Sequence, residues 1–171
     1  MNIMVTGDQG YIGSVLVPTL LEKGYDVVGF DSGYFTGNLL TDYSDFYPKI
    51  TKMLINGAVA KLKKNKISNF EIITVPGTFE IPVVVSNLIN KYDAFIVLGC
   101  VIKGQTPHFH YLCSSVINAL TDLSVQSKKP IGNGILTCDN KKQAVKRADP
   151  NIKDKGGDAV CAIISLLKII K

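Results

Sequence analysis

A junction of strand, loop and helix in the middle of the chain constrains the fold more than any other feature. The apolar run at residues 94–98 is typical of a buried parallel strand, and it ends at a glycine-containing loop. Thr106 and Pro107 then indicate a helix start, because threonine is a favourable N-cap and proline suits the first turn. The junction predicts a parallel α/β sheet with an anion site, since backbone N–H groups and the positive end of the helix dipole meet there.

His108 follows in the first turn of this predicted helix. The positive end of the dipole disfavours the imidazolium form, so we expect a neutral imidazole near pH 7 that can accept or donate a proton. An isolated histidine at such a position is more often a cap or a surface residue. The sequence therefore predicts an anion site with a candidate proton-transfer group beside it.

Strands and helices alternate on both sides of the junction. Helices are predicted at residues 50–63, 79–90, 107–125, 141–147 and 154–170, the last capped by Asp154, and strands at 71–75, 93–102 and 130–137. This order favours an α/β protein with a flavodoxin-like parallel sheet and helices on both faces. Ligands of such sheets bind outside the carboxyl ends of the strands, where the loops at 76–78, 103–106 and 138–140 fall.

The N-terminal residues 1–38 form a different kind of segment, which we interpret as a truncated βαβ fragment preceding a domain at 39–171. Strands are expected at 2–6 and 26–30 and a helix at 11–23. Gly7, Gly10, Gly13 and Asp31 follow the pattern of a dinucleotide-binding fingerprint and resemble the opening of NAD-dependent epimerases, the extended short-chain dehydrogenases. No tyrosine is followed four places later by lysine, as that family's catalysis requires. The fragment either binds NAD or is a remnant that serves as scaffold.

Composition narrows the function classes. The chain carries 46% hydrophobic residues and a net charge of +5, which is typical of a globular protein. Lys141, Lys142, Lys146 and Arg147 lie along one short predicted helix, without interleaved aromatic side chains that could stack on bases. We expect a solvated lysine face, with one or two charges reserved for an anionic substrate, and no nucleic-acid partner.

The cysteines and the apolar runs indicate where the protein acts. Four cysteines lie far apart, without the C-x-x-C spacing of a metal site, so we expect reduced thiols and no metal. No apolar stretch approaches the ~18 residues of a membrane span, and the first residues lack the basic start of a signal peptide. These features predict a cytoplasmic protein without a membrane partner.

Six short motifs, in this order, are similar to those of the 6,7-dimethyl-8-ribityllumazine synthases of riboflavin biosynthesis. They are residues 44–47 (SDFY), 75–82 (VPGTFEIP), 99–109 (GCVIKGQTPHF), 133–137 (NGILT), 147–148 (RA) and 154–156 (DKG). The resemblance implies a transferase that condenses 5-amino-6-(ribitylamino)uracil with 3,4-dihydroxy-2-butanone 4-phosphate, expelling phosphate and water. It implies no cofactor, small-molecule substrates, and a homo-oligomer of pentamers or larger shells with sites between subunits.

The resemblance also implies roles for particular residues. His108 would be the catalytic proton carrier, and Gln105, Thr106 and Arg147 would hold the phosphate. The remaining substrate-binding residues implied are Phe46 for the uracil ring, Thr78, Phe79 and Glu80 for the ribityl chain, Cys100, Val101 and Ile102 for the pyrimidine pocket, and Asn133 and Lys155. From the residues alone, Phe79 can equally be core packing, and Arg147 and Lys155 can be solvated helix residues.

Two departures from the family pattern keep other functions open. Asn133 stands where the commonest pattern has phenylalanine. In the family pattern, an apolar central strand of the sheet directly precedes the residue that corresponds to Phe46. Residues 39–43 (LLTDY) are poorly suited to such a strand. Either this segment pairs weakly in the sheet, or one of the N-terminal strands takes its place. The alternatives are an NAD-binding protein related to epimerases and reductases, or an inactive fusion that lacks the first strand of the synthase domain.

Overall fold

The structure is a computed structural model that describes residues 2–6, 26–30 and 47–170, with side chains described in the last range. The chain divides into two compact units, Met1–Tyr43 and Ser44–Lys171. In the first unit, β1 (Asn2–Thr6) pairs in parallel with β2 (Asp26–Phe30), as the sequence predicts. The helix expected at 11–23, the three fingerprint glycines with Asp31, and the expected boundary after residue 38 lie outside the described residues.

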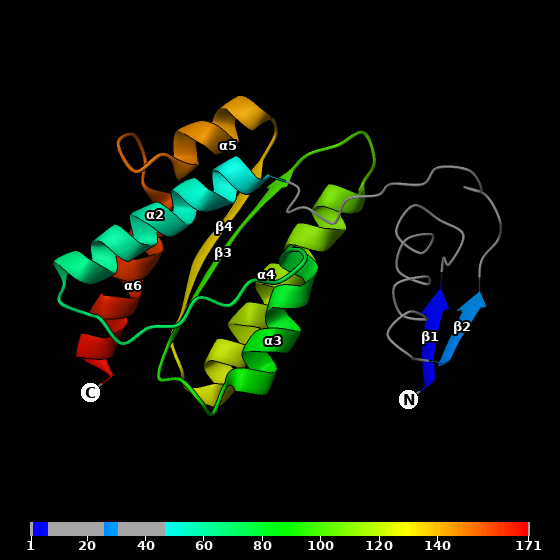
Figure 1. The fold of residues 1–171 in the computed structure, drawn as a ribbon, viewed down its shortest axis with the longest axis horizontal. Coiled ribbons are helices and arrows are strands. Elements are labelled where there is room, and N and C mark those ends of the chain that lie inside the picture. Colours follow the sequence, from blue (N-terminus) through cyan, green and yellow to red (C-terminus); the bar gives the residue numbers. More distant parts are fainter. Residues whose placement is uncertain (1, 7–25, 31–46, 171) are drawn as a thin grey trace. The chain divides into compact units, whose positions relative to one another are not determined.

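The second unit is built on a parallel pair of strands between two layers of helices (Figure 1). β3 (Phe95–Ile102) and β4 (Ile131–Cys138) are in register from Phe95 opposite Ile131 to Ile102 opposite Cys138. One face carries α2 (Pro48–Lys64), α5 (Lys141–Ala148) and α6 (Lys155–Ile169), and the other carries α3 (Ile81–Leu88) and α4 (His108–Ser127). A parallel sheet covered on both faces confirms the predicted α/β fold class.

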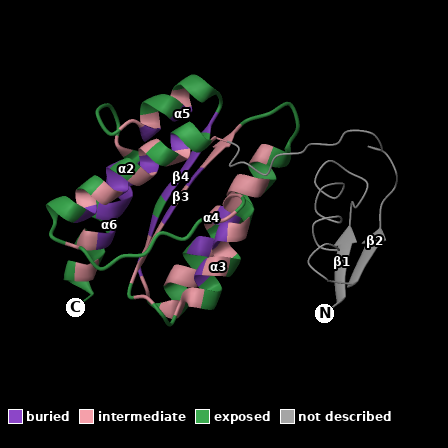
Figure 2. Ribbon diagram, in the orientation of Figure 1, coloured by how far each residue is buried: buried purple, intermediate pink, exposed green. Residues whose placement is uncertain are grey.

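The core follows from the apolar strands and from small residues where helices cross them closely. Buried residues concentrate on β4 and on one stripe of each packed helix, whereas β3 is mostly half-buried (Figure 2). On β4, a Cβ added to Gly132 would lie 2.5 Å from the carbonyl oxygen of Ala159 on α6. Only glycine allows this close approach of helix and strand, which seats α6 on the sheet.

The strand predicted at residues 71–75 is wrong. The segment is extended loop without ladder bonds, and Ile72 and Ile73 remain 56% and 45% exposed. Strands need a partner, and within the described residues β3 pairs with β4 alone. In the N-terminal unit, β1 and β2 pair with each other.

Helix starts are set by local hydrogen bonding, and one of them differs from the prediction. The helix expected at 79–90 begins as a 3-10 turn, η1 (Thr78–Glu80), and continues as α3. Thr106 does not cap α4: Pro107 is the N-cap, with φ −62° and ψ −9°, and its carbonyl accepts from the His110 N–H at 3.0 Å. Because the fixed φ of proline already suits the helix, the turn begins one residue later and Thr106 stays exposed.

Candidate functional site

The carboxyl ends of β3 and β4 meet at one edge of the sheet. Ile102 lies opposite Cys138, and the Lys103 N–H donates to the Cys138 carbonyl at 2.8 Å. The loops at 103–107 and 139–140 therefore start side by side. This edge is where an open α/β sheet binds its ligand.

The start of α4 offers hydrogen-bond donors at this edge. Of the helices that follow β3 and β4, α5 is capped by Asn140, whose Oδ1 accepts from the Gln143 N–H at 3.0 Å, and α6 is capped by Asp154, whose Oδ1 accepts from the Gly157 N–H at 3.1 Å. Among the residues that the structure describes, no side chain forms a cap hydrogen bond at the start of α4. Its first N–H groups therefore have no side-chain acceptor, which suits an anion. Gln105, Thr106 and His108 lie exposed around them.

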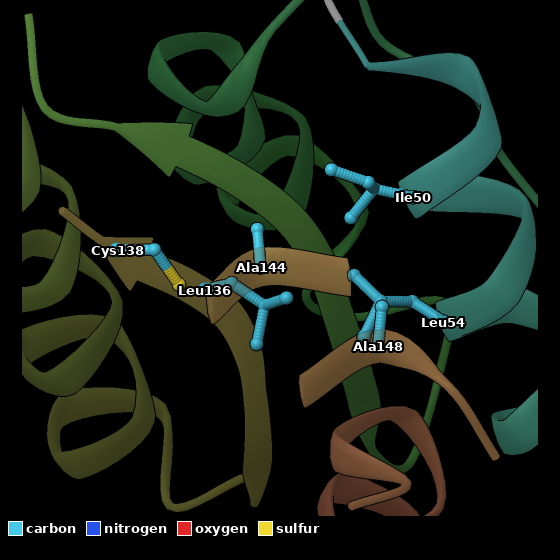
Figure 3. Close-up of a cluster of buried hydrophobic side chains, with 6 residues drawn as sticks. All are labelled: Ile50, Leu54, Leu136, Cys138, Ala144 and Ala148. Atoms are coloured by element: carbon cyan, nitrogen blue, oxygen red, sulfur yellow. The ribbon is translucent and has the colours of Figure 1, made fainter. Parts of the chain in front are cut away.

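Arg147 stands at the same edge, on α5. Ala144 and Ala148 of this helix are fully buried against Ile50 and Leu54 of α2, which fixes α5 beside the end of β4 (Figure 3). Burial raises the pKa of the Cys138 thiol, while the Arg147 guanidinium lowers it and Asp139 raises it. An influence of Arg147 on Cys138 requires proximity, so its positive charge lies near the end of β4.

The 3-10 turn η1 lies against the last part of β3. A Cβ added to Gly99 would lie 2.6 Å from Thr78 Cγ2, so Gly99 makes room for Thr78. Phe79 is 66% exposed, which excludes the core-packing interpretation of this residue. Sequence reasoning missed the role of Gly99, although a glycine inside a strand is a recognised sign of close approach by another backbone or side chain.

The last residues of β3 divide their side chains between the two helix layers. Cys100 and Ile102 pack with the cluster that contains Leu54 and Cys138, whereas Val101 packs with the cluster of α3 and α4. All three are half-buried. Their side chains thus form the walls of the sheet edge on both faces.

The remaining predicted residues are not all brought to this edge. Lys155 is exposed at the first position of α6 and pairs with Asp158 at 2.8 Å. Asn133 lies five residues before the end of β4, roughly 16 Å along the strand. It lines a shallow groove of about 180 Å³ with side chains of α4 and with Ile131. Within this chain Asn133 is therefore separated from the other site residues, and Phe46 lies outside the described residues.

The described residues contain no group of three or more His, Cys, Asp or Glu side chains placed to hold a metal ion. In the same part of the chain, no helix has the length and apolar character needed to cross a bilayer.

The fold defines a layered α/β protein whose candidate ligand site lies beyond the carboxyl ends of its parallel strands. The family model of 6,7-dimethyl-8-ribityllumazine synthase matches residues 43–171. The synthase of Saccharopolyspora erythraea is 38% identical over 128 residues, covering 74% of this chain and 78% of the relative. A synthase of Rhodopseudomonas palustris is 44% identical over 131 residues, covering 72% and 80%.

The chain belongs to the 6,7-dimethyl-8-ribityllumazine synthase family. It is an enzyme of the transferase class that serves riboflavin biosynthesis. Residues 3–70 also match the model of the NAD dependent epimerase/dehydratase family, so the N-terminal segment is similar to a second family over less than half of the chain.

Proposed function

We propose that this protein condenses 5-amino-6-(ribitylamino)uracil with 3,4-dihydroxy-2-butanone 4-phosphate to give 6,7-dimethyl-8-ribityllumazine, with loss of phosphate and water. The observation that carries the proposal is the α4 start without a side-chain cap, joined to the end of β4 by the bond between Lys103 and Cys138. Family membership supplies the reaction, and this edge supplies a place for its phosphate group.

The phosphate sits at the start of α4. The backbone N–H groups of Gln105 and Thr106 donate to its oxygens, and the helix dipole favours its negative charge. Arg147 adds a planar guanidinium that binds phosphate through two parallel N–H donors. Holding the phosphate fixes the carbonyl carbon of the same substrate relative to the amine of the other, which accounts for much of the rate acceleration.

His108 moves protons between the two substrates. Imine formation and phosphate elimination both transfer protons near neutral pH, which is the range where imidazole works best. The residue is exposed in the first turn of α4, directly after the phosphate position. The substrates bring the amine and the carbonyl, so the protein needs no nucleophile of its own.

The second substrate lies along the end of β3. Phe46 stacks on the uracil ring, and Cys100, Val101 and Ile102 line the pyrimidine. The turn Thr78–Glu80 holds the ribityl chain, because Phe79 is exposed and the half-buried Thr78 and Glu80 still present their polar groups to a ligand. Lys155 binds near the phosphate or the pyrimidine edge, after leaving its exposed pair with Asp158, which costs little.

The position of Asn133 supports a homo-oligomer of pentamers or larger shells with the site between subunits. Within one chain Asn133 lies far from the other site residues. A second copy of the chain could bring its own Asn133 to them by placing its groove between α4 and β4 against the carboxyl edge of this sheet. We place the reaction in the cytoplasm, in keeping with four cysteines that lie far apart in the sequence. In this proposal the synthase domain spans 39–171, and residues 1–38 are a truncated dinucleotide-binding-like fragment.

The direct test is to mix the purified full chain with both substrates and to follow lumazine absorbance together with phosphate release. We expect His108→Ala to lower kcat by about 10²-fold, the lower end of the effect of a positioned acid-base group. His110→Ala, which changes the adjacent exposed histidine, is the matched control.

The same assay separates phosphate binding from proton transfer. We expect Arg147→Ala to raise the KM for the butanone phosphate by roughly 10- to 100-fold, the loss expected for a charge-assisted hydrogen bond, with a smaller effect on kcat. Parental kinetics in both the His108 and the Arg147 variants would contradict these roles. Absence of product with the unchanged protein would contradict the function itself.

A further inference from the structure

Helix α5 carries a cluster of positive charge beside the proposed phosphate position. Lys141, Lys142 and Lys146 are exposed on this helix. Lys141 is three residues past Cys138, a span of at most about 11 Å, and the Cys138 carbonyl is bonded to Lys103 at the end of β3. Lys141 and Lys142 therefore lie near the end of β4, at the sheet edge where the loop toward α4 starts, while α5 itself covers the opposite face from α4.

Lys141 and Lys142 weaken the start of the helix that carries them, whereas Lys146 lies in its last turn. The first turn of α5 contains Lys141 and Lys142 and no acidic residue, although the positive end of a helix dipole disfavours cations there. Lys142 and Lys146 are four residues apart, a spacing at which like charges repel on one helix face. Charges that are unfavourable for their own helix are expected where a residue serves function rather than stability, and the rest of the fold compensates for them.

Within the described residues, the nearby carboxylates form no ion pair with the cluster, although their charges offset part of it. Asp139 accepts from the Gln143 side chain, Asp149 accepts from the Asn151 N–H at 2.8 Å, and Asp154 caps α6. In the described part of the chain the ion pairs are Lys91 with Glu71 and Lys155 with Asp158. No lysine of α5 takes part in either, so their field is open to an external anion.

We propose that Lys141, Lys142 and Lys146 form an electrostatic collar that raises the affinity of the site for a doubly charged phosphate monoester without touching the reacting atoms. The inference rests on the proposed function, whose two substrates differ in charge. The collar strengthens binding of the phosphorylated substrate and leaves the uncharged pyrimidine substrate unaffected. Because the lysines do not contact reacting atoms, kcat does not depend on them.

The test replaces Lys142 and Lys146 together by glutamine in the full chain. The control, Lys63→Gln with Lys64→Gln, removes the same charge from the last turn of α2, whose Leu62 packs with the cluster around Ile96 rather than with Cys138. At low ionic strength we expect the KM for the butanone phosphate to rise roughly two- to fivefold in the α5 variant alone, the effect of two charges ~12 Å from a dianion in water. The difference from the parent should disappear near 1 M NaCl, where screening acts over about 3 Å.

A second measurement does not depend on turnover. Titration of each variant with inorganic phosphate at low salt should show the same loss of affinity in the α5 variant and none in the α2 control. Equal affinities in all three proteins, or an equal rise in the KM for both substrates, would overturn the collar. Loss of phosphate affinity in a protein that forms no lumazine would retain the collar and reject the proposed reaction.

Discussion

At the scale of single residues, Asp154 shows how one side chain fixes a helix start near the site. Its backbone lies in the left-handed region, at φ 39° and ψ 51°, and its Oδ1 accepts from the Gly157 N–H at 3.1 Å. Gly57 of α2 makes room for it, because a Cβ there would collide with the carboxylate. Aspartate and asparagine tolerate this backbone region better than other residues with side chains.

We predict that Asp154→Ala lowers the free energy of unfolding by roughly 1–2 kcal/mol, because the cap is lost and alanine is strained at positive φ. Asp154→Asn keeps both the acceptor and the backbone preference, so it should cost about 0.5 kcal/mol or less. Urea unfolding of both variants measures the difference. Equal destabilisation by alanine and asparagine would show that the carboxylate acts by its charge instead.

The sequence was sufficient to predict features that depend on residues close together in the chain. The Asp154 cap was predictable from an acceptor just before a periodic apolar run, and the sheet edge was predictable from the loops that follow the strands. The Thr106 cap failed because Pro107 itself adopts helical dihedral angles. The separation of Asn133 from the other site residues was not predictable, because roles inferred from motifs do not state which copy of a chain supplies them.

At the scale of elements, the segment that precedes η1 is held to the start of β3 by polar contacts instead of by strand pairing. The Glu71 carboxylate accepts from the Tyr92 hydroxyl and from Lys91 Nζ, the latter at 3.2 Å. The hydrogen bond from Tyr92 and then the proximity of Lys91 lower the pKa of Glu71 below its usual value of 4.5. A carboxylate whose pKa is lower in the folded state stabilises the fold above the unfolded pKa and loses that effect as pH falls.

We predict that Glu71→Gln lowers the thermal midpoint slightly at pH 7 and that the difference from the parent shrinks as pH falls below about 4.5. The effect is small because the groups are exposed to solvent. Asp122→Asn, an exposed carboxylate on α4, serves as the control for a change of charge alone. A difference that grows toward acid would contradict the assignment.

The predicted strand at 71–75 failed at this same scale, for a non-local reason. Residues 71–75 (EIITV) have a suitable apolar, β-branched composition, as do β3 and β4, which were predicted correctly. Amino-acid composition gives the preference of a segment for the β conformation, whereas hydrogen-bonded pairing also requires a neighbouring strand. Here that neighbour belongs to the part of the pattern in which this chain departs from its family.

At the scale of the whole molecule, the second unit exposes several apolar side chains in the segment before η1. Phe70, Ile72 and Ile73 are 38%, 56% and 45% exposed within four consecutive residues, and within the described residues β3 pairs with β4 alone. Contiguous apolar surface next to an unpaired strand edge favours association with other chains. The protein therefore has a specific site at which unwanted association begins.

We predict that Ile72→Lys slows concentration-dependent aggregation, measured by light scattering over time, without changing the free energy of unfolding by more than about 0.5 kcal/mol. Ile152→Lys introduces the same charge at a residue of similar exposure outside this segment and should leave aggregation unchanged. Equal slowing by both substitutions would attribute the effect to net charge.

The edge of β4 that faces away from β3 disfavours pairing with another strand, unlike the exposed apolar segment at residues 70–73. The Asn133 Oδ1 accepts from the Ile135 N–H at 2.9 Å, so a donor that another strand would need is already occupied. A strand from another chain is therefore less able to pair with this edge of β4. If a second copy of the chain associates at this flank, side-chain contacts must hold the two copies together, because main-chain pairing across the interface is blocked at this position.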